Sequence, residues 1–253
     1  MKLSIIVPTY NSASYISNLL DSYNGRGNKE VELIVVDDGS TDDTCAIVEK
    51  YKPDKLIKCE HKGVSAARNA GMMAAHGDYV WFVDSDDRLP VSGIKHVLAQ
   101  CNGKENIVAF NHYRYYKKIN RTRLRYERYA CRYYFHNRPY LWEVVWDRIY
   151  KRQFLLDNKI SFIEGLNFGE DEMFNLEALN ANNGMLQDKH AVYIKTFHNT
   201  GSICHNLTPE MKLQVFDELE KLKKKYKKDK RMCYEIDFTA WRQKRLKVFE
   251  EVA

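Results

Sequence analysis

The chain has 253 residues, of which 44% are hydrophobic, and its formal net charge is +6. This length and composition predict a folded protein with a full core and argue against a disordered chain. No run reaches the roughly 18 apolar residues that a membrane span requires. We therefore expect a cytoplasmic protein, which could also bind peripherally to the inner face of the cell membrane.

Strands and helices are predicted to alternate through the first part of the chain. Apolar and β-branched runs predict strands at residues 3–7, 31–36, 55–59, 79–83 and 106–110. Helical patterns occupy residues 14–24, 64–76 and 91–101. Ser40 is expected to cap another helix, with Thr41, Asp42 and Asp43 in its first turn. The alternation predicts an α/β fold, Rossmann-like, with a mostly parallel sheet and right-handed crossovers.

Polar residues directly follow three of these strands. They are Thr9-Tyr10-Asn11, Asp37-Asp38-Gly39-Ser40 and Asp84-Ser85-Asp86. Because ligands of open parallel sheets bind outside the carboxyl ends of the strands, these clusters predict a nucleotide or another phosphate-bearing ligand. Asp84 and Asp86 point the same way in an extended backbone and could share a hard divalent cation. An acidic turn that caps the next helix is the alternative.

Two common phosphate-binding motifs are missing from the sequence. No G-x-G-x-x-G follows the first strand, and no G-x-x-x-x-G-K-[ST] occurs anywhere in the chain. We therefore expect side chains and a metal ion to hold the ligand in place of a glycine-rich loop.

Four motifs in order carry a family resemblance over roughly the first 110 residues. They are PTYN at residues 8–11, VDDGS at 36–40, GVSAARN at 63–69 and VDSDD at 83–87. In this order they resemble the family 2 glycosyltransferases with the GT-A fold. The resemblance implies a nucleotide-sugar donor held by Pro8, Thr9, Tyr10, Asn11, Asp37, Asp38, Arg68, Asp84, Ser85 and Asp86.

The same resemblance implies a role for each of these groups. Thr9 and Tyr10 would flank the nucleobase, and Asp37 or Asp38 would accept from a uracil N–H. Arg68 would reach the base or the pyrophosphate, with a salt bridge on the helix surface as the alternative. Asp84 would contact the ribose or a metal-bound water, and Asp86 would bind Mg²⁺ or Mn²⁺ across the pyrophosphate.

An inverting transferase also needs a general base for the acceptor hydroxyl. The acids Glu170, Asp171 and Glu172 precede a helical run, where plain capping is the alternative. The resemblance implies that Asp171 is the base, with Glu170 and Glu172 as local alternatives.

Two further residues are candidates for the acceptor side. Trp146 lies in WEVVWDRIY, which resembles an acceptor-site segment of the family, and it could stack on a sugar or be a buried core residue. His198 lies where the family closes a loop over the pyrophosphate, and an ordinary surface histidine is the alternative.

Two segments are rich in basic residues. Residues 112–138 interleave basic and aromatic side chains, which predicts a β-hairpin near the acceptor, with an anionic acceptor or a lipid phosphate as a secondary role. The same pattern is typical of proteins that bind single-stranded nucleic acid. Residues 209–253 are predicted to be helical throughout. Their lysines could rest on an anionic membrane surface, with a solvated helix pair that closes the domain as the alternative.

Together these features predict one GT-A domain with an extension. Residues 1–110 would form its nucleotide-sugar-binding half, 111–205 its acceptor-side half, and 206–253 a basic helical extension. The predicted activity is metal-dependent, inverting transfer from a UDP-sugar to a hydroxyl of a glycan or lipid-linked glycan, as in cell-surface polysaccharide biosynthesis. A nucleic-acid-binding protein, a nucleotidyltransferase and an inactive donor-binding relative are the alternatives, and we expect no nucleic acid partner.

Overall fold

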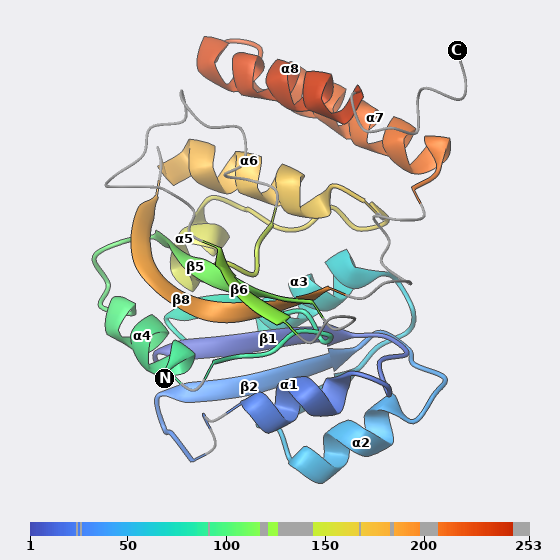
Figure 1. The fold of residues 1–253 in the computed structure, drawn as a ribbon. Coiled ribbons are helices and arrows are strands. Elements are labelled where there is room, and N and C mark those ends of the chain that lie inside the picture. The colour runs from blue at the N-terminus through green and yellow to red at the C-terminus, as the bar shows by residue number, and fades with distance from the viewer. Residues whose placement is uncertain are drawn as a thin grey trace.

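The structure is a computed structural model of the chain, drawn as a ribbon in Figure 1. It describes residues 1–23, 25, 27–90, 92–116, 121–125, 144–166, 168–182, 185–197 and 207–244. No helix within these ranges combines the length and the apolar composition that a membrane span needs.

The first part of the chain alternates strands and helices, as its hydrophobic pattern predicts. Its strands are β1 (Leu3–Thr9), β2 (Val31–Asp37), β3 (Lys55–Lys58) and β4 (Tyr79–Phe82). Its helices are α1 (Ile16–Ser22), α2 (Thr44–Tyr51), α3 (Val64–Ala74) and α4 (Gly93–Gln100). The four strands are parallel and lie in the order β3-β2-β1-β4, so their carboxyl ends share one edge of the sheet.

The remaining elements turn this parallel sheet into a mixed one. The strands are β5 (Ile107–Tyr116), β6 (Arg121–Arg125), β7 (Arg148–Lys151) and β8 (Leu186–Phe197). The helices are α5 (Arg152–Asp157), α6 (Glu170–Asn182), α7 (Pro209–Lys225) and α8 (Lys230–Lys244). β7 lies between β4 and β5 and is antiparallel to both, while β8 runs parallel to β5. The α/β fold is confirmed, with antiparallel pairing on one side of the sheet.

Each face of the sheet is covered by its own hydrophobic core. Along β1, Leu3, Ile5 and Val7 face the core that includes α1, α2 and α4, whereas Ile6 faces the core that includes α3, α5 and α6. Successive side chains of a strand point to opposite faces, so a strand buried on both sides is largely apolar, and the buried Ser4 of β1 is satisfied by donating to Glu32 of β2 at 2.6 Å. Figure 1 shows α7 and α8 beyond α6, on the side away from α1 and α2.

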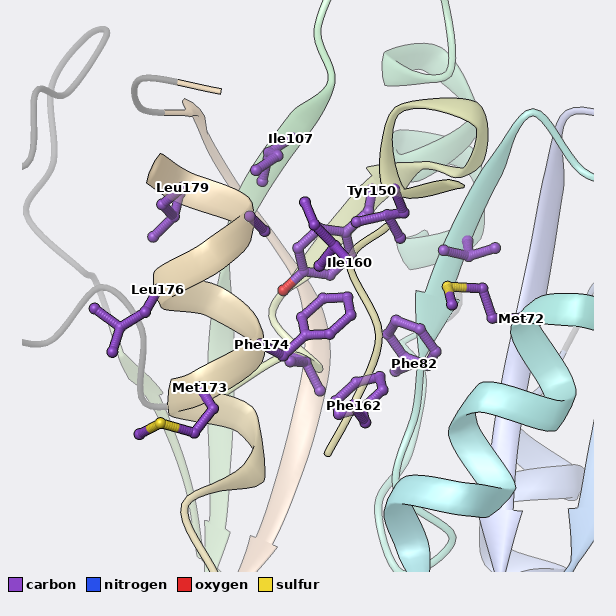
Figure 2. Packing of buried hydrophobic residues seen from close by; sticks show 14 of the residues in the cluster. Met72, Phe82, Ile107, Tyr150, Ile160, Phe162, Met173, Phe174, Leu176 and Leu179 are labelled. Carbon is purple, nitrogen blue, oxygen red and sulfur yellow. The ribbon is translucent and has the colours of Figure 1, made fainter. Parts of the chain in front are cut away.

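An aromatic cluster connects α6 to β4 (Figure 2). The ring of Phe162 stacks on Phe174 of α6, with ring centroids 4.2 Å apart, and meets the edge of Phe82 of β4 at 5.0 Å. The hydroxyl of Tyr150 donates to Oδ1 of Asn175, with the two oxygens 2.6 Å apart. This packing places the amino end of α6, which carries acidic residues, near the carboxyl end of β4.

Two predicted boundaries are wrong. α2 begins at Thr44, not at Thr41, because the Asp42 carboxylate accepts from the Thr44 backbone N–H and holds the preceding residues in a turn. β5 continues to Tyr116, beyond the strand predicted at residues 106–110, because it pairs with both β6 and β8. The helical segment predicted from residue 209 onward is confirmed as the helix pair α7 and α8, and residues 245–253 lie outside the described residues.

Candidate active site

Polar side chains at the ends of β1, β2 and β4 lie against one another, as predicted. Thr9 at the end of β1 is the register partner of Asp37 at the end of β2. Ser12, just after β1, lies with its Oγ 3.0 Å from Oγ of Ser85, just after β4. The three predicted clusters therefore line one edge of the sheet.

The carboxylate of Asp38 is used to organise the loop before α3. It accepts from the backbone N–H groups of Lys62 and Gly63 at 2.9 and 2.8 Å, and Nδ1 of His61 lies 2.8 Å from its Oδ2. Gly63 has φ +92°, a backbone conformation that residues with a side chain rarely adopt. Asp37 accepts from the backbone N–H of Ser40 at 3.0 Å, and both aspartates are buried.

The PTYN motif divides into a buried half and an exposed half. Pro8 and Thr9 are buried within β1, whereas Tyr10 and Asn11 are exposed. The ring of Tyr10 stacks on His61, with centroids 4.1 Å apart, and so presents an aromatic surface beside the strand ends. Oδ1 of Asn11 accepts from the backbone N–H of Thr41 at 2.9 Å. The sequence patterns did not single out His61.

Arg68 is buried at the centre of the site. Its Nη2 lies 3.1 Å from Oδ1 of Asp84, and its Nη1 lies 3.1 Å from Glu170 and 2.9 Å from Asp171. The guanidinium also lies over the ring of Phe162, 5.2 Å from its centroid. A salt bridge on the helix surface, the alternative for this residue, is therefore wrong.

Asp171 lies at the amino end of α6 with both carboxylate oxygens engaged. Oδ1 accepts from Arg68, and Oδ2 accepts from the backbone N–H of Val145 at 3.1 Å. Burial raises the pKa of Asp171 to about 7, although Arg68 acts in the opposite direction. A carboxyl group with this pKa can exchange a proton near neutral pH. Glu172 is buried, whereas the side chains of Glu170 and Asp171 are 16% and 14% exposed.

Asp84, Asp86 and Asp87 form an acidic cluster after β4. One oxygen atom from each lies within 4.8 Å of the others. Side-chain exposure differs among them, at 24% for Asp84, 34% for Asp86 and 0% for Asp87. Carboxylate oxygens are the ligands that Mg²⁺ and Mn²⁺ prefer, so the donor set fits such an ion, with Asp84 and Asp86 on the accessible side.

Two residues of β8 reach this acidic cluster, and sequence analysis missed both. Nζ of Lys195 lies 3.1 Å from Asp84, 3.1 Å from Asp87 and 3.9 Å from Asp86. The hydroxyl of Tyr193 donates to Asp87 at 2.6 Å. Burial alone would lower the pKa of Lys195, but Asp84 and Asp87 raise it, so the side chain is an ammonium ion. A lysine directly after the apolar run AVYI at residues 191–194 was the signal that could have identified it.

Trp146 occupies the position of a core residue. It is 6% exposed, stacks on Tyr193 with centroids 4.6 Å apart, and meets the edge of His112 at 4.7 Å. Of its two predicted roles, this packing favours the buried one. The other acceptor candidate, His198, lies outside the described residues, as do residues 117–120 and 126–138 of the basic segment.

Comparison with known proteins gives the class of this chain. The model of the family described as Glycosyl transferase family 2 matches residues 4–169, so the chain belongs to this family. It is 34% identical over 202 residues to poly(ribitol-phosphate) beta-N-acetylglucosaminyltransferase TarS of Staphylococcus aureus. That match covers 76% of this chain and 35% of TarS, so the chain spans about a third of that relative.

Solved structures agree with the family assignment. The crystal structure of S. aureus TarS 1-349 in complex with UDP-GlcNAc superposes with a TM-score of 0.77 at 25% identity, covering 96% of this chain and 72% of that one. Glucosyl-3-phosphoglycerate synthase from Mycobacterium tuberculosis, in complex with Mn²⁺, UDP and glucosyl-3-phosphoglycerate, shares the fold with a TM-score of 0.57 at 17% identity. That match covers 81% of this chain and 74% of the synthase.

Replacing Arg68 tests the charge balance of the site. We expect Arg68→Met to lower the free energy of unfolding by about 3–5 kcal/mol at pH 8, because Asp84, Glu170 and Asp171 lose their shared cation. The loss should shrink at pH 5, since the uncompensated carboxyl groups then bind protons more readily in the folded variant. Urea unfolding at both pH values measures this difference.

The exposed Lys95 on α4 offers a matched control. Lys95→Met removes one positive charge from a solvated position and should change the free energy of unfolding by no more than about 0.5 kcal/mol. An equal loss for Arg68→Met at pH 8 and pH 5 would mean that its packing on Phe162, and not its charge, stabilises the fold.

Proposed function

We propose that this chain is a metal-dependent, inverting glycosyltransferase that takes its sugar from a UDP-sugar. The observation that carries the proposal is the link between two acidic groups through Arg68: Asp84 on one side, and Glu170 with Asp171 on the other. One group is suited to a leaving diphosphate with its cation, and the other to an attacking hydroxyl. A single-displacement transferase must hold the leaving diphosphate and the attacking hydroxyl on opposite sides of the same sugar carbon.

The donor nucleotide would lie across the ends of β1 and β2. Tyr10 and His61 offer a stacked aromatic surface for the base, and Asp37 and Asp38 offer carboxylate acceptors for a uracil N–H. Thr9, Asn11 and Ser85 complete the polar rim of this part of the site, while Pro8 supports it from within β1. The UDP-GlcNAc bound by TarS 1-349 makes this the first donor to test.

Asp86 and Asp84 would hold a Mg²⁺ or Mn²⁺ ion beside the diphosphate. Such an ion supplies Lewis-acid stabilisation of the negative charge that develops on the leaving group. Mn²⁺ accompanies UDP in glucosyl-3-phosphoglycerate synthase, which supports a metal in a site of this fold. Asp87 would support the site from below, because Tyr193 and Lys195 already engage its buried carboxylate.

Asp171 would act as the general base. The acceptor oxygen bonds to the anomeric carbon as the bond from that carbon to the diphosphate oxygen breaks, and the hydroxyl proton passes to Asp171. Attack from the side opposite the leaving group inverts the anomeric centre. Arg68 and the Val145 N–H hold the carboxylate in place, and each carboxylate oxygen keeps a second lone pair for the incoming proton.

The acceptor is proposed to be a hydroxyl of a phosphate-bearing glycan. Arg114 of β5 is the register partner of both Arg123 of β6 and Lys195 of β8, so three cationic side chains lie in a row on one face of the sheet. Neither arginine has an ion-pair partner in the described part of the chain, and the buried Nε of Arg114 has no hydrogen-bond partner. The row of cationic side chains begins at the acidic cluster, and the negative charges of a polyanionic acceptor would compensate its positive charge.

The chain could work at the inner face of the cell membrane, on a lipid-linked acceptor. The apolar side of α7, at Val215, Leu219 and Leu222, is buried against the domain. Lys212 of α7 is buried, whereas Lys221, Lys224 and Lys225 near its carboxyl end are exposed and would be the surface that meets anionic lipid. The packing leaves little apolar surface for insertion, so the attraction would be electrostatic.

Three rival functions fit the site less well. A nucleic-acid-binding protein leaves the buried Asp171–Arg68–Asp84 link without a purpose. A nucleotidyltransferase would use a glycine-rich basic loop after the first strand, and PTYNSAS lacks one. An inactive donor-binding relative would not need Asp171 held beside Asp84.

Donor and metal binding can be tested together by thermal shift. UDP-GlcNAc with Mn²⁺ should stabilise the wild-type protein, by about 2.7 kcal/mol at a hundredfold excess over Kd, and EDTA should remove most of this gain. Asp86→Ala should abolish transfer and the Mn²⁺-dependent shift while the protein stays folded. Undiminished transfer by this variant, or in EDTA, would contradict the metal proposal.

The base is tested by Asp171→Asn and by pH. Transfer should fall by about 10²–10⁴-fold in this variant while UDP-GlcNAc binding persists, because only proton acceptance is lost. In the wild type, the transfer rate should fall as pH drops below about 7, since the raised pKa leaves Asp171 protonated there. Glu170→Gln is the matched variant: transfer should persist and still fall toward low pH, but from a lower midpoint, because the charge of Glu170 helps to raise the pKa of Asp171. Normal transfer by Asp171→Asn would place the base elsewhere.

The acceptor proposal is tested with ribitol-phosphate oligomers of the kind named for TarS. Arg114→Met should raise KM for the oligomer about tenfold or more, because it loses a charge-assisted hydrogen bond, while donor KM changes little. Lys95→Met again serves as the control for loss of one positive charge. Equal KM values for wild type and Arg114→Met would show that the acceptor phosphate binds elsewhere.

A further inference from the structure

Lys195 is placed where a divalent cation would also have to bind. Its ammonium lies 3.1 Å from Asp84, 3.1 Å from Asp87 and 3.9 Å from Asp86, the same three residues whose oxygens cluster within 4.8 Å of one another. Its position is restrained, since Lys195 belongs to β8 and its Nζ lies 5.8 Å from the ring centroid of Trp146. The cluster therefore has a cation of its own.

Asp84 is compensated from two directions. Arg68 pairs with its Oδ1 and Lys195 with its Oδ2. Asp87 is also fully engaged, because Oδ2 accepts from Tyr193 and Lys195, and Oδ1 accepts from the backbone N–H of Thr196. Both carboxylates are thus committed to donors within the protein before any ligand arrives.

This arrangement should make the cluster a poor site for a lone divalent cation. Such an ion would share carboxylate oxygens with an ammonium a few ångströms away, and like charges at that distance repel strongly where water is scarce. A nucleoside diphosphate changes the balance, because its phosphate oxygens bring negative charge and ligands for the ion. The ion and the diphosphate should then bind together much more tightly than either alone.

We propose that Lys195 is a positioning residue that makes divalent-cation binding at Asp84 and Asp86 depend on the nucleoside diphosphate. The proposal rests on the proposed function, since it assumes that a diphosphate occupies this edge of the sheet. Its consequence is coupled loading: the donor-free protein holds little metal, and the metal enters with the donor. Coupling of this kind is reciprocal, so Mn²⁺ strengthens UDP binding by the same factor as UDP strengthens Mn²⁺ binding.

The test measures Mn²⁺ binding by electron paramagnetic resonance of the unbound ion, with and without UDP, and does not require transfer. Lys195→Met should bind Mn²⁺ alone at least about tenfold more tightly than the wild type, because the competing charge is gone. The factor by which UDP strengthens Mn²⁺ binding should fall correspondingly. A variant that was merely damaged would bind Mn²⁺ more weakly, not more tightly.

Matched variants separate charge from shape. Lys195→Arg keeps the positive charge and should bind Mn²⁺ alone as weakly as the wild type. Lys195→Met combined with Asp87→Asn removes one charge of each sign and should return Mn²⁺ affinity toward the wild-type value. Lys195→Gln removes the charge but keeps an amide donor, and it replaces Lys195→Met if that variant does not fold.

The location of the ion is checked by adding Asp86→Ala to Lys195→Met, which should remove the gained affinity. Unchanged or weaker Mn²⁺ binding by folded Lys195→Met and Lys195→Gln would overturn the proposal. Failure of the proposed function would give a different result, because UDP would then not bind the wild type even with Mn²⁺. The Mn²⁺ affinities of the wild type and the Lys195 variants would still decide whether Lys195 opposes the ion.

Discussion

The ion pairs of Arg68 are the interaction on which the candidate site depends. This one guanidinium contacts Asp84 after β4 and both Glu170 and Asp171 at the amino end of α6. Carboxylates buried this close together would repel without a shared cation, and a buried unpaired charge is highly unfavourable. The strand end and the helix can therefore approach each other only because α3 brings Arg68 between them.

A second buried cation extends the same principle. Lys195 compensates Asp84 from the other side and also reaches Asp87, so a chain of alternating charges runs from β8 through Asp84 and Arg68 to α6. Because both cations are held by packed elements, the site is preorganised before substrates bind. The leaving-group side and the attacking side of the proposed reaction are thus fixed relative to each other by electrostatics as well as by packing.

Aromatic packing supplies the rigidity that these charges require. The Phe162 ring lies against the Arg68 guanidinium and contacts both Phe82 of β4 and Phe174 of α6 (Figure 2), so the hydrophobic core continues directly up to the guanidinium. At the acidic cluster, the Trp146 ring stacks on Tyr193 and lies under Nζ of Lys195. Aromatic rings beside each cation exclude water and strengthen the ion pairs that assemble the site.

The sequence by itself determined the strand and helix alternation of the first part of the chain and the polar strand ends, because each depends on neighbouring residues and on a local period. The family resemblance added Asp171 as the candidate general base. Only the tertiary structure decided that β7 inserts antiparallel beside β4, that Trp146 is buried, and that Arg68 and Lys195 meet at Asp84. These features depend on contacts between residues far apart in the chain, and no local pattern of charge or hydrophobicity encodes which distant partner a buried cation will find.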